Sequence, residues 1–218
     1  MNLDEILDAA AQIFSQKGYH AASMHDIAEA VRLQKASLYH HVSSKQEILL
    51  ALLDRALDLL IERLSAVVAS SLPADEKLQA AIHSYVETLT EQRQLAAVLL
   101  LEHRSLEPAL RERHLPRRDR FESLWRSLIQ EGIDQGVFDG RHEPAAAARA
   151  LLGAMNWTIT WYRPEGARSG REIAGQYADL FLQGLLAPRP PRGECRGAGA
   201  TAQEAAPRHE CRDTGSSL

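Results

Sequence analysis

The chain has 218 residues with a formal net charge of −4, and 45% of them are hydrophobic. This composition allows one or two domains with a true core, and the weak acidity excludes a protein that coats nucleic acid indiscriminately. No run is apolar enough to span a membrane, and the opening segment MNLDEILDAA is acidic where a signal peptide would be basic. We therefore expect a cytoplasmic protein with no membrane partner.

Two short helices are predicted to follow, along the chain, an amphipathic helix that runs from Ile6 to Phe14. Ser23 can cap the first of them, with Asp26 three residues later in a capping-box arrangement. The second runs from about Gln34 to His41, with Leu38 facing inward, and a short helix of this kind fits the major groove of DNA. Ser44 and Glu47 form another predicted capping box, which places Lys45 at a helix N-terminus where it can bind a phosphate. The candidate DNA-binding residues are Ser23, Arg32, Gln34, Lys35, Ala36, Ser37, Tyr39, His40 and Lys45.

This amino-terminal segment resembles the TetR family of one-component repressors over roughly the first fifty residues. The matching residues are Gly18-Tyr19, Ser23, Ile27-Ala28, the run Lys35 to His41, and Ser44-Lys45. Two positions depart from the family pattern, because Arg32 stands where the turn usually has glycine and Val42 stands where a phenylalanine is usual. Arg32 can strain the turn at positive φ or contact a phosphate, and His40 and His41 can be DNA contacts or simply exposed polar residues.

The rest of the chain is predicted to be helical, so the expected fold is all-α. A long helix from about Ser44 to Ser70, about 40 Å in length, should connect the DNA-binding segment to a second domain. Its apolar stripe is Ile48, Leu49, Leu52, Leu53, Ala56, Leu59, Leu60, Leu64 and Val67. Further helices are expected at 75–91, 94–105, 107–113, 117–135, 144–162 and 170–186, separated by Pro73, Pro108, Pro116, Pro144 and Pro164.

Three regions follow from these elements. We expect a helix-turn-helix domain at 1–46, a helical effector-binding and dimerisation domain at 47–187, and a disordered tail at 188–218 that contains Cys195 and Cys211. The last two helices carry apolar stripes and the small residues Ala150, Gly153 and Ala154, which suit a four-helix interface between two copies. A homodimer also fits DNA geometry, because two recognition helices about 34 Å apart read a palindrome. The TetR resemblance implies the same interface.

A cluster of basic and aromatic residues in the second domain suggests an effector site. Aromatic side chains can line a cavity while arginines at its mouth bind an anion. The candidates are His103, Arg104, Arg117, Phe121, Trp125, Met155, Asn156, Trp157, Trp161, Tyr162 and Arg163. The segment from Asn156-Trp157 to Arg163-Pro164, with Gly166, Ser169 and Gly184-Leu185, is similar to TetR-type regulators of fatty-acid, sterol and aromatic-acid degradation. That resemblance implies release from DNA by an acyl-CoA thioester.

Other interpretations remain open. Trp157 and Trp161 can be ordinary core or dimer packing, and the arginine run 111–120 can be a solvated face paired with Glu112, Asp119 and Glu122. The effector can be a drug-like molecule that controls an efflux pump, or the protein can be a helical dimer that acts through protein contacts. We expect no enzyme and no cofactor, since the sequence has no phosphate loop or nucleophile elbow. We expect no metal site, because His20, His25, His83, His114 and His142 lack ligand spacing.

Overall fold

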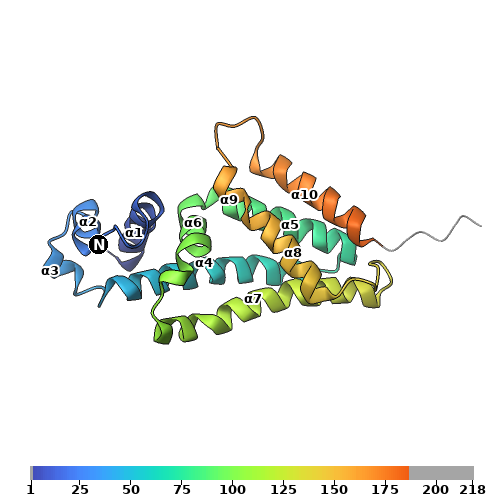
Figure 1. Cartoon of the computed structure of the whole chain (residues 1–218), viewed down its shortest axis with the longest axis horizontal. Helices are drawn as coiled ribbons and strands as arrows, with labels where there is room; N and C mark the ends of the chain where they lie inside the picture. Colours follow the sequence, from blue (N-terminus) through green and yellow to red (C-terminus); the bar gives the residue numbers. More distant parts are fainter. Residues whose placement is uncertain (1, 187–218) are drawn as a thin grey trace, which may run out of the picture. The chain divides into compact units, whose positions relative to one another are not determined.

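Helices make up the regular structure of residues 2–186, the part of the chain that this computed structural model describes (Figure 1). The all-α prediction is therefore confirmed. Within that part, extended backbone pairs only at an isolated bridge between Phe138 and Leu186. The predicted disordered tail and its two cysteines lie outside the described residues.

Three helices form the amino-terminal segment, residues 2–44, which we call the head: α1 (Leu3–Lys17), α2 (Met24–Ala30) and α3 (Lys35–Leu38). Asn2 and Glu5 form a capping box at the start of α1, and the helix ends at Gly18, whose φ of 77° suits glycine. The capping box predicted for Ser23 and Asp26 is present at the start of α2. Local hydrogen bonds thus set both helix starts.

The helix α3 is shorter than predicted. It ends at Leu38, and the next residues form tighter turns, in which the His40 N–H donates to the Ser37 carbonyl at 3.2 Å and the His41 N–H donates to the Leu38 carbonyl at 3.0 Å. These bonds to the third residue back replace the α-helical pattern, as is common at helix ends. Of the expected segment 34–41, only Lys35–Leu38 is α-helical.

The long helix α4 (Lys45–Val68) belongs to both the head and the rest of the protein. Its predicted stripe is buried except for Leu59 and Val67, which are partly exposed. Ser44 caps it by accepting a hydrogen bond from the Glu47 N–H at 3.1 Å. The predicted capping box is only half formed, because the Glu47 carboxylate pairs with Arg113 at 3.1 Å instead.

The remaining helices, which we call the body, pack around α4. They are α5 (Ala74–Glu91), α6 (Arg93–Glu102), the 3-10 helix η1 (His103–Ser105), α7 (Pro108–Asp134), α8 (Pro144–Asn156), α9 (Thr158–Trp161) and α10 (Gly170–Leu185). Helices α5 and α7 both pack against α4, while α10 covers α5 and α8 covers α7 (Figure 1). Helix α6 contacts both α1 and α4, so it lies where the head meets the body.

Two predicted boundaries in the body are wrong. Helix α7 continues through Pro116, which was expected to separate two helices. Pro116 is exposed, so water can satisfy the carbonyl that its missing N–H leaves free. Conversely, the helix expected at 144–162 ends at Asn156. The Thr160 hydroxyl there donates to the Trp157 carbonyl at 2.7 Å, a local bond that competes with the helical pattern.

Candidate DNA interface and effector pocket

The recognition segment around α3 buries one side chain and exposes its basic and aromatic ones. Leu38 is fully buried, while Lys35 and His40 are exposed and Tyr39 has 46% of its surface exposed. Of the other candidates here, Gln34 and Ala36 are exposed and Ser37 is partly exposed. The exposed face therefore presents a cation, a phenol and an imidazole, all of which can donate hydrogen bonds to DNA.

Arg32 has the left-handed backbone conformation that its place in the turn suggested. Its φ of 55° is the only positive value at a non-glycine among the described residues, and its side chain is exposed. Such a residue is strained by about 1 kcal/mol or more. The other departure from the family pattern, Val42, is buried against the core of the head.

Two further candidates have internal contacts: that of Lys45 was not predicted from the sequence, whereas Ser23 forms the predicted capping box. The Lys45 ammonium donates to the Tyr19 carbonyl at 2.9 Å and to the Ala22 carbonyl at 2.7 Å, and it lies 4.3 Å from the centre of the Tyr19 ring. The Ser23 hydroxyl donates to the Asp26 carboxylate at 2.7 Å. Contacts of Lys45 and Ser23 with DNA remain predictions. The structure shows that both residues stabilise the turn between α1 and α2.

A chain of hydrogen bonds joins the head to the segment between α6 and α7. The Glu102 carboxylate accepts from the Tyr19 N–H at 3.1 Å and from the Ser105 hydroxyl at 3.2 Å. The Gln46 side chain donates to the Ser105 carbonyl at 2.9 Å and accepts from the Glu107 N–H at 3.0 Å. The end of α6 is therefore tied to both the turn after α1 and the start of α4.

A cavity of about 430 Å³ opens inside the body, and we call it the bundle cavity. Most of its lining is apolar: Leu57, Leu99, Leu100, Leu101, Leu115, Phe121, Leu152, Trp157 and Ile159 contribute. On one wall the Tyr85 hydroxyl donates to the Asn156 side-chain oxygen. Burial raises the pKa of Tyr85, so its hydroxyl stays protonated. An apolar ligand fits such a site, with a few polar groups to orient it.

The predicted effector residues divide into three groups. His103, Phe121, Asn156 and Trp157 line the bundle cavity. Trp125 and Met155 are fully buried in the core instead, and Trp125 Nε1 is the only buried side-chain polar atom without a partner in residues 2–186. Arg104, Arg117, Trp161, Tyr162 and Arg163 do not line this cavity. Trp157 and Trp161 are 66% and 45% exposed, so neither is packed in the core of this chain, and the alternative that they pack in a dimer interface stays a prediction.

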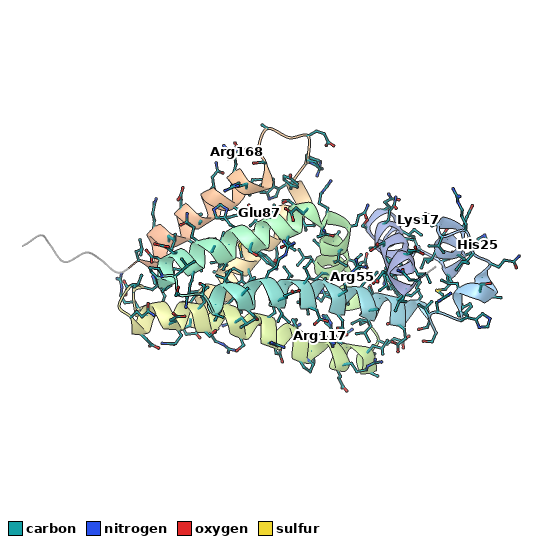
Figure 2. All side chains as sticks on the ribbon, turned by 180° about the vertical axis from the view of Figure 1, so that it is seen from behind. Lys17, His25, Arg55, Glu87, Arg117 and Arg168 are labelled. Atoms are coloured by element: carbon teal, nitrogen blue, oxygen red, sulfur yellow. The ribbon has the colours of Figure 1, made fainter. Side chains whose placement is uncertain are left out.

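Two arginines of α7, Arg113 and Arg117, pair with carboxylates of α4 and not with the acidic residues on their own helix. Arg117, labelled in Figure 2, contacts Asp54 at 3.1 Å and Asp58 at 3.0 Å. The buried His114 lies 2.8 Å from Asp54. These pairs hold α7 on α4 on both sides of Pro116, and they explain why Arg117 does not reach the cavity.

The arginines that line the bundle cavity are Arg111 and Arg118, which the sequence analysis did not select. The lining residues of α7 are Arg111, His114, Leu115, Arg118, Phe121 and Glu122, which recur every three or four positions. That spacing marks one face of a helix. The sequence contains this spacing, but we expected a helix break at Pro116, and two separate helices would not share one continuous face.

His103 adds a titratable group to the cavity wall. Burial lowers the pKa of His103, and the neighbouring Arg104 lowers it further. The imidazole is therefore neutral near pH 7, and it can accept or donate a hydrogen bond without adding charge.

A second cavity, of about 800 Å³, lies where α1, α4, α6, α9 and the end of α5 meet, and we call it the junction cavity. Its charged lining residues are Asp8, Arg55, Glu91 and Arg93. The Arg55 guanidinium bonds the Asp8 carboxylate at 2.8 Å, which links α4 to α1 (Figure 2 labels Arg55). The Arg93 guanidinium lies 5.8 Å from the centre of the Tyr162 ring. No residue pattern indicated this cavity, because its wall combines residues of five separate helices.

Neither a membrane span nor a metal site is found in the described part of the chain. None of its helices is both long and apolar enough to cross a membrane. It also contains no group of three or more histidine, cysteine, aspartate or glutamate residues placed to hold a metal ion.

Family models match both parts of the chain. Residues 6–52 match bacterial regulatory proteins of the tetR family, and residues 71–185 match the tetracyclin repressor-like C-terminal domain. The chain belongs to the TetR family. It is thus a DNA-binding transcriptional regulator, with the two TetR domains in their usual order.

Similar proteins resemble this TetR-family chain over most of its length. It is 30% identical over 185 residues to the HTH-type transcriptional repressor KstR2 of Rhodococcus jostii, which covers 84% of this chain and 91% of that protein. The TetR family regulator PfmR from Thermus thermophilus superposes with a TM-score of 0.76 at 36% identity, over 82% of this chain and 97% of PfmR. AibR in complex with isovaleryl coenzyme A and operator DNA gives a TM-score of 0.74 at 27% identity, over 85% and 98% of the two chains.

Proposed function

We propose that this protein is a repressor that binds a palindromic operator as a homodimer and is released by an acyl-CoA thioester. The observation that carries this proposal is the pairing of an exposed basic recognition face with an apolar cavity in one TetR-type chain. A ligand that binds the DNA-free conformation better shifts the population away from DNA.

The DNA half of the proposal rests on the residues around α3. Lys35, Tyr39 and His40 are exposed on or directly after the second helix of the helix-turn-helix, the element that such motifs place in the major groove. Base contacts specify sequence, whereas phosphate contacts position the protein. We assign sequence reading to Lys35, Tyr39 and His40, and phosphate binding to Arg32.

The effector half rests on the bundle cavity. Its leucines and aromatic side chains suit an acyl chain, while Arg118 supplies a cation that has no ion-pair partner among residues 2–186. AibR, a structural relative, was solved with isovaleryl coenzyme A. That relationship supports a thioester as the ligand class here.

Operator binding is tested with DNA from the protein's own promoter in a gel shift at several salt concentrations. We expect Lys35→Ala and His40→Ala to change the preference among operator variants, and the exposed Arg171→Ala on α10 to leave it unchanged. Binding should weaken steeply as salt increases. A dimer that ignores this DNA at low salt would instead support a role through protein contacts.

Effector identity is tested by adding butyryl-, octanoyl- and palmitoyl-CoA to the complex with operator DNA. We expect one or more of them to release the DNA, and free coenzyme A and the free fatty acids to do much less. Release by hydrophobic drugs, with all thioesters inactive, would support the efflux-regulator alternative, for which the apolar lining of the cavity is also suitable.

A further inference from the structure

The bundle cavity and the junction cavity share part of their lining. Leu101 of α6 and Ile159 of α9 belong to both. Leu101 is 58% exposed although it is a large apolar residue. A ligand that fills the bundle cavity can therefore continue past these two side chains into the junction cavity without entering the core.

The two cavities differ in chemistry. The bundle cavity has a mostly apolar wall, whereas charged and amide side chains line much of the junction cavity, including Gln16, Gln92 and Gln94. Arg93 has no carboxylate within ion-pair distance among residues 2–186, and the Tyr162 ring beside it restricts its orientation. A planar guanidinium held in this way is well suited to a phosphate.

We propose that the junction cavity binds the polar, phosphate-bearing end of the ligand whose apolar end occupies the bundle cavity, with Arg93 as its main phosphate contact. This inference rests on the proposed function, because it assumes a thioester ligand with both ends. The larger volume of about 800 Å³, against about 430 Å³ for the bundle cavity, matches a polar end that is bulkier than the acyl end.

Ligand binding at this position acts directly on the head. Asp8 of α1 and Arg55 of α4 form an ion pair on the cavity wall. A phosphate that binds Arg55 competes with Asp8, and the contact between α1 and α4 weakens. The polar end of the ligand thereby contributes to release from DNA, while the acyl end determines which thioester is accepted.

The test compares each acyl-CoA of the butyryl, octanoyl and palmitoyl series with the corresponding S-acyl pantetheine, which keeps the thioester and lacks the nucleotide and its phosphates. Release of fluorescent operator DNA is followed by anisotropy. For the unmodified protein we expect the active acyl-CoA to act at a concentration at least tenfold lower than its pantetheine analogue. Arg93→Gln should remove most of this difference and leave the response to the pantetheine analogue unchanged.

Three control variants make the outcome specific. Arg93→Lys should keep part of the difference, and Arg171→Gln, an exposed arginine on α10, should keep all of it. Loss of the difference in Arg118→Gln but not in Arg93→Gln would overturn the inference, because the polar end would then lie along α7. Equal activity of the two ligand forms on the unmodified protein would overturn it as well. Inactivity of every thioester would overturn the proposed function itself. Thermal unfolding of each variant confirms that it is folded.

Discussion

The Glu102 carboxylate accepts a hydrogen bond from the Tyr19 backbone N–H at 3.1 Å, which joins the last residue of α6 to the turn after α1. The preceding residues Leu99 to Leu101 line the bundle cavity. We therefore expect a movement of α6 caused by a ligand to reach the head through this bond.

Glu102→Ala should reduce the coupling between effector and operator. It leaves the part-buried Tyr19 N–H without its acceptor, which costs about 1–3 kcal/mol of stability. We expect a lower melting temperature and a shallower release of operator DNA by the effector, measured by anisotropy. Glu112→Ala, at an exposed position on α7, is the control and should change neither quantity. A loss of stability with unchanged coupling would show that the bond is only structural.

Lys45→Met should destabilise the head in the absence of DNA. The ammonium loses its bonds to the Tyr19 and Ala22 carbonyls, and charged hydrogen bonds contribute about 1.5–3 kcal/mol each, less where water replaces them. Chemical denaturation of the DNA-free protein measures this change, with the exposed Lys35→Met as a control that should unfold like the unmodified protein. If Lys45→Met is fully stable and binds all DNA sequences more weakly, the ammonium acts mainly on phosphate.

Two substitutions at Arg32 separate backbone strain from DNA contact. Arg32→Gly should stabilise the free protein by about 1 kcal/mol, because glycine tolerates a φ of 55°. Arg32→Ala keeps the strain and removes the charge. If the guanidinium binds a phosphate, the two variants should weaken operator binding equally. Differential scanning calorimetry should show a higher melting temperature than that of the unmodified protein only for Arg32→Gly. Unchanged operator affinity in both variants would rule out the phosphate contact.

Asp26 should make the stability of α2 depend on pH. Hydrogen bonds from Lys17 and Ser23 hold the pKa of the Asp26 carboxyl well below its ordinary value of 3.8. Since the pKa is lowered in the folded state, the stabilisation is present above 3.8 and is lost as the pH falls through the folded value. The difference in melting temperature between the unmodified protein and Asp26→Asn should therefore narrow below about pH 4. Asp179→Asn, exposed on α10, should show no such trend.

The parts of the structure predictable from sequence were those fixed by local interactions. The capping box at Ser23 and the inward face of the short helix at Leu38 follow from the residue pattern, and the strained turn at Arg32 followed from the TetR resemblance, in which glycine is usual there. The length of α7 was missed, because contacts with α4 stabilise it on both sides of Pro116.

The effector residues were harder to predict, because a cavity wall depends on tertiary packing. Phe121 and Trp125 lie four positions apart on α7, yet only Phe121 lines the bundle cavity and Trp125 is fully buried. Similarly, Arg117 and Arg118 are adjacent in the sequence but lie on different faces of α7. Arg117 pairs with Asp54, whereas Arg118 lines the bundle cavity. The residue composition identified the part of the chain that lines the cavity. Which of two neighbouring residues faces the cavity is decided by how the helices pack.

Leu180→Glu should convert a homodimer into a monomer if α10 forms the interface. Leu180 is 66% exposed on α10, where Ile173, Ala174 and Ala178 instead face the core of the same chain. An exposed apolar residue of this size is typical of an interface, and a buried charge there opposes association. Size-exclusion chromatography with light scattering measures the mass, and Leu72→Glu, which changes a 41% exposed leucine outside α10, should leave it unchanged. Because two linked heads are needed to read a palindrome, the monomer should also lose most of its operator affinity. A Leu180→Glu protein that keeps the dimer mass would place the interface on another face.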